Sequence, residues 1–167
     1  MTRDESAMEI IARVLMREGG VADVGDGAGV TRYGQTTAWL ATYGFPAPTD
    51  AVMAAQNYRT WLVRTRLIGV CDYPDGFADG VVDWAVNSGH RPVIQELQRI
   101  FGLHVDGVFG PEVQARVDAC DRPKMARLVL GSRLRFLGRL ITGQPERQSR
   151  WAAGWMNRVA SQVEALA

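Results

Sequence analysis

The stretch from Ile10 to Thr36, I-I-A-R-V-L-M-R-E-G-G-V-A-D-V-G-D-G-A-G-V-T-R-Y-G-Q-T, joins a helical pattern to a glycine-rich turn. Apolar residues recur at the three-and-four spacing of an amphipathic helix, at Met8, Ile11, Ala12 and Leu15. Glu18 comes three residues after Leu15 and so continues that apolar side. Gly19 and Gly20 then end the helix, because glycine readily adopts the left-handed conformation of a C-terminal cap. We therefore expect a helix that delivers one carboxylate to a turn.

Glu18 has two interpretations. A carboxyl group at the edge of a buried face loses hydration, which favours the protonated form that a general acid needs. Alternatively, Glu18 is an ordinary last-turn residue before a glycine cap. The next segment favours the chemical interpretation, because Asp26 and Thr31 lie among glycines in a polar turn or short hairpin. A carboxylic acid facing a second carboxylate and a hydroxyl is an arrangement that glycosidases use, so the candidate catalytic residues are Glu18, Asp26 and Thr31.

The same residues carry a resemblance to a known family. The runs E-G-G at 18–20 and D-G-A-G-V-T-R-Y-G-Q-T at 26–36 are similar to the E-G-G…D-x-G-G-x-T-x-x-G-I-T signature of the N-acetylmuramidases of glycoside hydrolase family 108. The resemblance to phage-type lysozymes is more distant. Further stretches match in order: Tyr58-Arg59 with Trp61, Asp83 to Gly89, Val105 to Glu112, and Gly154 to Arg158. The resemblance implies a mainly α, lysozyme-like fold that cleaves the β-1,4 bond between N-acetylmuramic acid and N-acetylglucosamine, as phage endolysins do.

The resemblance also implies substrate contacts from Tyr33, Tyr58 and Asn87. The ring of Tyr58 or of Trp61 would stack on a sugar, although aromatic residues on such a helix more often pack in a core. Asn87 would line the glycan cleft, although it and Asp83, one helical turn apart, could instead pair with neighbouring backbone.

The chain departs from the family pattern at several positions. Val21 stands where the family pattern has an aromatic residue after E-G-G. Ala28 replaces one of the paired glycines, and Gln35 replaces the isoleucine of G-I-T. The linker to Asp26 is also shorter and lacks N-D-P. These departures affect the expected position of Asp26 more than that of Glu18, and they leave room for a protein without activity. Two alternatives to the muramidase are therefore kept. One is a lytic transglycosylase that needs only Glu18; the other is an inactive wall-binding or phage structural protein that kept the fold.

Two regions are expected along the chain. Residues 1–89 would form the catalytic lobe and residues 90–167 a helical region whose last helix packs back on it, possibly as one compact domain. The pattern L-Q-R-I-F-G-L-H-V-D-G-V-F-G-P-E at 97–112 resembles small peptidoglycan-binding modules. By itself the pattern specifies only two helices joined by a tight turn.

The composition indicates a soluble globular protein. The 167 residues are 47% apolar and 22% charged, with a net charge of +1. A net charge this close to zero does not indicate electrostatic attraction to nucleic acid or to membranes. No secretory or membrane-spanning stretch is evident, so we expect a cytoplasmic monomer that reaches its partner, the peptidoglycan glycan strands, through a holin or a secretion system. Cys71 and Cys120 lack metal-ligand spacing, so free thiols are expected, with no metal or cofactor.

Overall fold

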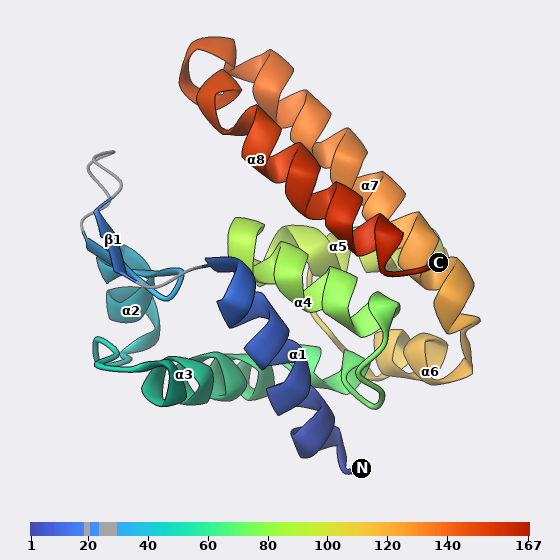
Figure 1. Cartoon of the computed structure of the whole chain (residues 1–167). Helices are drawn as coiled ribbons and strands as arrows, with labels where there is room; N and C mark the ends of the chain where they lie inside the picture. Colours follow the sequence, from blue (N-terminus) through green and yellow to red (C-terminus); the bar gives the residue numbers. More distant parts are fainter. Residues whose placement is uncertain (19–20, 24–29) are drawn as a thin grey trace. The chain divides into compact units, whose positions relative to one another are not determined.

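A computed structural model describes residues 1–18, 21–23 and 30–167, and these residues are mainly helical, which confirms the expected fold class (Figure 1). The chain forms two compact units, Met1–Pro74 and Asp75–Ala167. The division lies earlier than the expected boundary at Gly89, because the helix that begins at Gly76 packs with later helices. Among the described residues, none of the helices combines the length and the apolar character needed to cross a bilayer.

The first unit consists of helices around a small sheet. Its elements are α1 (Arg3–Glu18), β1 (Val21–Asp23), β2 (Val30–Arg32), β3 (Gln35–Thr36), α2 (Thr37–Tyr43), α3 (Ala51–Arg64) and the 3-10 helix η1 (Leu67–Val70). Two of its helices begin at side-chain caps, since Thr36 accepts from the Trp39 N–H and Asp50 from the Met53 N–H.

Helix α1 packs against α3 and η1 with a face that differs slightly from the expected one. Ala7, Ile11 and Val14 are buried, whereas Ala12 is exposed, so the expectation for Ala12 was wrong. The buried stripe advances by four and three residues, and Glu18 follows Val14 by four. The last residue of α1 therefore continues the buried face, as the spacing predicts.

The sheet is antiparallel in the order β1-β2-β3. Thr31 pairs with Ala22 on one side and with Thr36 on the other. Strands β2 and β3 are joined by the two residues Tyr33 and Gly34, which have φ angles of 53° and 78°. Positive φ at both central residues is the conformation of the tight hairpin turns that match the twist of the flanking strands.

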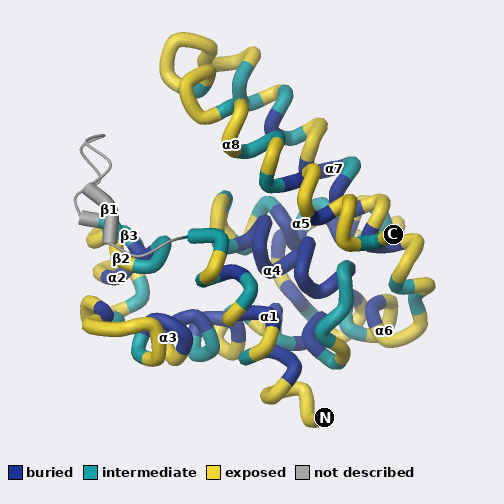
Figure 2. Tube along the Cα trace, viewed as in Figure 1, coloured by how far each residue is buried: buried dark blue, intermediate teal, exposed yellow. Residues whose placement is uncertain are grey.

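The second unit is entirely helical in its described residues. It comprises α4 (Gly76–Ser88), α5 (His90–Phe101), α6 (Pro111–Ala119), α7 (Arg122–Gly143) and α8 (Pro145–Glu164). Figure 2 shows α4 buried along most of its length, while α7 and α8 run side by side with exposed outer faces. Helix α5 begins at His90 and contains Pro92 in its first turn, where proline is tolerated.

The turn between α5 and α6 is held by the buried amide of Gln98. The Gln98 Oε1 atom accepts hydrogen bonds from the backbone N–H groups of Asp106 and Gly107, at 3.1 and 2.9 Å. Its Nε2 atom donates to Asp106 Oδ1 at 2.6 Å and to the Val108 carbonyl at 3.1 Å. One side chain thus fixes the tight turn of the 97–112 pattern.

A buried charge cluster joins α4, α7 and α8. Asp83, which is 0% exposed, accepts from Arg133 Nη1 at 2.6 Å and from Arg158 Nη2 at 2.7 Å. Gln162 continues the network by accepting from Arg133 and donating to Asp79. Burial raises the pKa of the Asp83 carboxyl, but hydrogen bonds and charges from Arg158 and Arg133 outweigh burial, so this pKa lies below its usual value. Two of the motif stretches, around Asp83 and Arg158, therefore meet in an ion pair that only the structure reveals.

Each unit contains one cysteine, and neither forms a disulfide. Cys71 is buried in the first unit, and Cys120 is half-buried in the second. Burial raises the pKa of the Cys120 thiol, so little thiolate forms near neutral pH.

Candidate active site

The candidate site lies in the first unit, where α1 ends beside the β2–β3 turn. Glu18 is the last residue of α1 and is half-buried. Its position at the end of a buried stripe directs the carboxylate towards the sheet and away from the exposed face that holds the Glu9–Arg13 ion pair. The helix thus delivers one carboxylate to a turn, as the sequence suggested.

Gly34 brings two functional groups together at this turn. A Cβ atom added to Gly34 would lie 2.8 Å from Glu18 Oε2 and 2.8 Å from the Tyr58 hydroxyl oxygen. Both distances are shorter than real Cβ contacts allow, so the carboxylate and the phenol occupy the space that any other residue at position 34 would fill. The absence of a side chain at Gly34 is what lets both groups approach the turn.

Tyr33 is in a conformation that non-glycine residues rarely adopt. Its φ of 53° places it in the left-handed region, which costs an L-residue roughly 1–2 kcal/mol. The Tyr58 hydroxyl donates a hydrogen bond of 3.2 Å to the Tyr33 carbonyl and so anchors the turn to α3. Strained residues that surrounding contacts hold in place concentrate at functional sites.

The Tyr58 ring belongs to an aromatic core. It is 2% exposed and packs with Trp39 and Trp61, at centroid distances of 5.4 and 6.4 Å. This burial leaves no ring face for a sugar to stack on, so the stacking role considered for Tyr58 does not fit. Its hydroxyl, which reaches the turn beside Glu18, is the part of Tyr58 that can act at the site.

Thr31 lies on the central strand of the sheet, two residues before Tyr33. Its Oγ1 atom is buried and has no hydrogen-bond partner among the described residues. Buried polar atoms are almost always satisfied, and an exception calls for an explanation such as a ligand or an ordered water. Thr31 thus presents a hydroxyl that the described residues leave unpaired, in the segment that adjoins the carboxylate.

Two other candidates are not joined to this group by the structure. Asp26 lies outside the described residues, as do Gly19 and Gly20, so their roles remain predictions. Asn87 is in the second unit, where its amide donates to the Asp83 carbonyl at 3.0 Å within α4. That bond is the backbone pairing considered from the sequence. The part of Asn87 in substrate binding also remains a prediction.

Gln35 is a site-adjacent residue whose role the sequence did not indicate. It directly follows Gly34 and is fully buried. Its Nε2 atom donates to the Ala54 carbonyl at 2.8 Å, and its Oε1 accepts from Asn57 at 2.9 Å. The position that carries isoleucine in the family pattern is therefore filled by a hydrogen-bonded amide pair. An amide at Asn57, one helical turn after Met53 on the buried side of α3, was the available signal.

Comparison with known proteins relates the second unit to peptidoglycan. Residues 92–160 match the family model of a predicted peptidoglycan domain, PG_binding_3. This segment contains the Gln98-centred turn and most of α5 to α8. This segment of the second unit is therefore similar to a predicted peptidoglycan domain, which supports an association with peptidoglycan.

A solved structure relates the whole chain to a particular protein. The fold is similar to that of SagA from Brucella abortus, with a TM-score of 0.75 and 26% sequence identity over 97% of this chain and 94% of that one. A search of curated proteins found no match. The resemblance to glycoside hydrolase family 108 depends on the motifs alone and stays a prediction.

Proposed function

We propose that the protein hydrolyses peptidoglycan, as a muramidase that cleaves the β-1,4 bond between N-acetylmuramic acid and N-acetylglucosamine. The observation that supports this proposal is the convergence of the Glu18 carboxylate and the Tyr58 hydroxyl on the side-chain-free Gly34 turn. The similarity of residues 92–160 to a predicted peptidoglycan domain supports the substrate class.

Glu18 would act as the general acid. Its carboxyl group would give a proton to the bridging glycosidic oxygen as the bond to the sugar C1 breaks and positive charge develops at that carbon. The Tyr58–Tyr33 hydrogen bond would keep the turn, and hence the substrate path, in place beside the acid. Near the developing charge, the Thr31 hydroxyl would hold the attacking water, with Asp26 as the candidate second carboxylate.

The test is digestion of purified peptidoglycan by the wild-type protein and by Glu18→Gln, with fragments identified by mass. Glu9→Gln is the matched control, because Glu9 lies on the same helix and only forms an exposed ion pair with Arg13. We expect fragments ending in reducing muramic acid from the wild type and the control. Glu18→Gln should lose about 100-fold or more of this activity, the contribution typical of general acid catalysis.

The alternatives predict different fragments. Anhydro-muramic ends from the wild type would indicate a lytic transglycosylase. If neither protein releases sugar while both pellet with the wall, the chain is a wall-binding protein, and the proposal of hydrolysis is wrong.

A further inference from the structure

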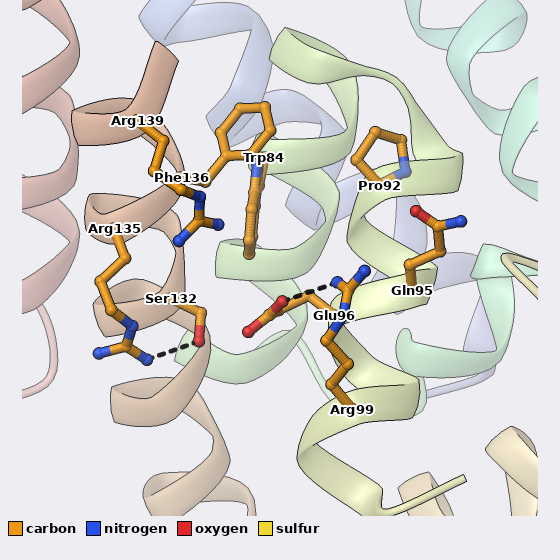
Figure 3. Close-up of a pocket in the computed structure, with 9 residues that line it drawn as sticks. All are labelled: Trp84, Pro92, Gln95, Glu96, Arg99, Ser132, Arg135, Phe136 and Arg139. Carbon is orange, nitrogen blue, oxygen red and sulfur yellow. Dashed lines mark hydrogen bonds and ion pairs between the residues drawn. The ribbon is translucent and has the colours of Figure 1, made fainter. Parts of the chain in front are cut away.

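A cationic cavity lies within the second unit, between α4, α5 and α7. Its volume is about 470 Å³, and Figure 3 shows the side chains that line it. Trp84 and Phe136 form the aromatic wall, with ring centroids 5.6 Å apart. Three guanidinium groups border it, from Arg99 on α5 and from Arg135 and Arg139 on α7, against a single carboxylate, Glu96.

The arginines are only partly neutralised. Arg99 donates to Glu96 at 3.0 Å, and Arg135 donates to the Ser132 hydroxyl at 2.9 Å (Figure 3). Arg139 has no side-chain partner among the described residues. One acid against three cations leaves the cavity with an excess of positive charge, and a concave site between low-dielectric walls concentrates that field.

Besides Arg139, the cavity has a second hydrogen-bond donor without a partner among the described residues, and it belongs to the aromatic wall. The indole Nε1 of Trp84, a residue that is 2% exposed, is buried without a hydrogen-bond partner among the described residues. An indole N–H is a donor only, so its natural complement is an acceptor oxygen. Donors thus predominate in the lining, which carries three guanidinium groups and an indole N–H. Its acceptors are the Gln95 amide, the Glu96 carboxylate and the Ser132 hydroxyl, and the last two already accept from Arg99 and Arg135.

We infer that this cavity binds the carboxylate groups of the peptide stems that peptidoglycan carries. Guanidinium forks match carboxylates through paired hydrogen bonds, and the aromatic wall would contact the aliphatic part of the stem. All the lining residues except Trp84 fall within the matched segment 92–160. The inference rests on peptidoglycan as the substrate, but it concerns the peptide and a site separate from Glu18.

The test is calorimetric titration of the full chain carrying Glu18→Gln, so that turnover plays no part. The probes are the disaccharide with its tetrapeptide, the same compound with amidated carboxylates, the peptide-free disaccharide, and inorganic phosphate. The variants are Arg135→Gln with Arg139→Gln, and Arg127→Gln as the control. Arg127 is an exposed arginine of α7 that does not line the cavity.

We expect the paired variant to bind the free-acid tetrapeptide compound about tenfold or more weakly, the loss typical of hydrogen bonds to charged groups. The control should bind as tightly as its parent, and amidation should weaken binding to the parent by a similar factor. Equal binding by the paired variant, equal binding of the amidated compound, or tighter binding of phosphate than of the stem would overturn the inference.

Two further measurements test whether the variants fold normally and whether positive charge alone accounts for binding. The arginines are exposed, so the variants should retain the circular dichroism spectrum and melting temperature of the parent. Paired Arg→Lys substitutions, which keep the charge but lose the fork, should give intermediate affinity. Because fragment release is measured separately, an inactive protein that still discriminates the free from the amidated stem would disprove hydrolysis while supporting this site.

Discussion

Asn57 Nδ2 donates a hydrogen bond of 2.9 Å to Oε1 of Gln35, so a buried amide pair fastens strand β3 to helix α3 directly behind the candidate site. Asn57 also donates to the Pro46 carbonyl at 3.0 Å, which ties the loop after α2 to the same pair. Three segments of the first unit thus depend on two amide side chains.

Gln35→Ile, which installs the residue of the family pattern, should destabilise the protein. The substitution leaves the buried Asn57 amide short of an acceptor, which costs about 1–3 kcal/mol. Combining it with Asn57→Leu should cost less than the two single losses added together, because both polar partners are then gone. Urea unfolding measures these changes, with Gln56→Leu, on the exposed side of α3, as the control. Strict additivity would show that the pair is not coupled.

Gly34→Ala should lower activity more than stability. The new Cβ would meet Glu18 and Tyr58 at 2.8 Å and displace the carboxylate, and a misplacement of this kind costs on the order of 100-fold in rate. Gly44→Ala is a close control, because Gly44 also has a positive φ, of 66°, but has nothing within 4 Å of its added Cβ. Both variants should lose about 1 kcal/mol of stability to backbone strain, and only Gly34→Ala should lose peptidoglycan cleavage. If Gly34→Ala and Gly44→Ala cleave peptidoglycan equally well, the Gly34 turn does not position the Glu18 carboxylate.

Asp83→Asn should be among the most damaging polar substitutions in the second unit. Removing the carboxylate leaves Arg133 and Arg158 facing each other in a buried site, and breaking such a pair costs about 3–5 kcal/mol. The same substitution at Asp4, whose exposed carboxylate pairs with Arg59, should cost about 1 kcal/mol or less. Denaturant unfolding of the two variants compares these losses directly. Similar values would mean that the buried cluster is relaxed or hydrated.

The contribution of Asp83 should also depend on pH. Its pKa is lower in the folded protein than in the unfolded chain, so the unfolded chain takes up protons first as the pH falls. The stabilisation is therefore complete above the ordinary carboxyl pKa of 3.8 and is lost as the pH falls through the lower, folded value. The difference in unfolding free energy between the wild type and Asp83→Asn should be constant near neutral pH and shrink on approach to about pH 3. A difference that stays constant over this range would contradict the assigned pKa direction.

Local patterns predicted much of this fold, and distant partners account for what was missed. The spacing along α1 predicted that Glu18 ends the helix on its buried face, because helical periodicity is a property of neighbouring residues. The pairing of Asp83 with Arg133 and Arg158 joins residues 50 and 75 positions apart, which no local pattern contains. Ala12 was misplaced because alanine gives a weak preference for either face.

The domain boundary was missed for a related reason. The glycine and proline residues at 89–92 suggested a break, yet α4 packs with the helices that follow it. Helix α4 is buried along most of its length, so the unit that it joins depends on its packing partners, which its own sequence does not identify. The same limit applies to Gln35, where the sequence showed a departure from a pattern but not the amide that compensates for it.

The single cysteine in each unit gives the molecule a built-in pair of reporters. Cys71 becomes accessible to an alkylating reagent only when the first unit opens, whereas Cys120 lies partly at the surface of the second. The two adducts fall in different proteolytic peptides, so pulsed alkylation followed by peptide mapping reads the opening of each unit separately in one sample. A wall fragment that protects one thiol and leaves the other unchanged would show which unit holds it, without any substitution.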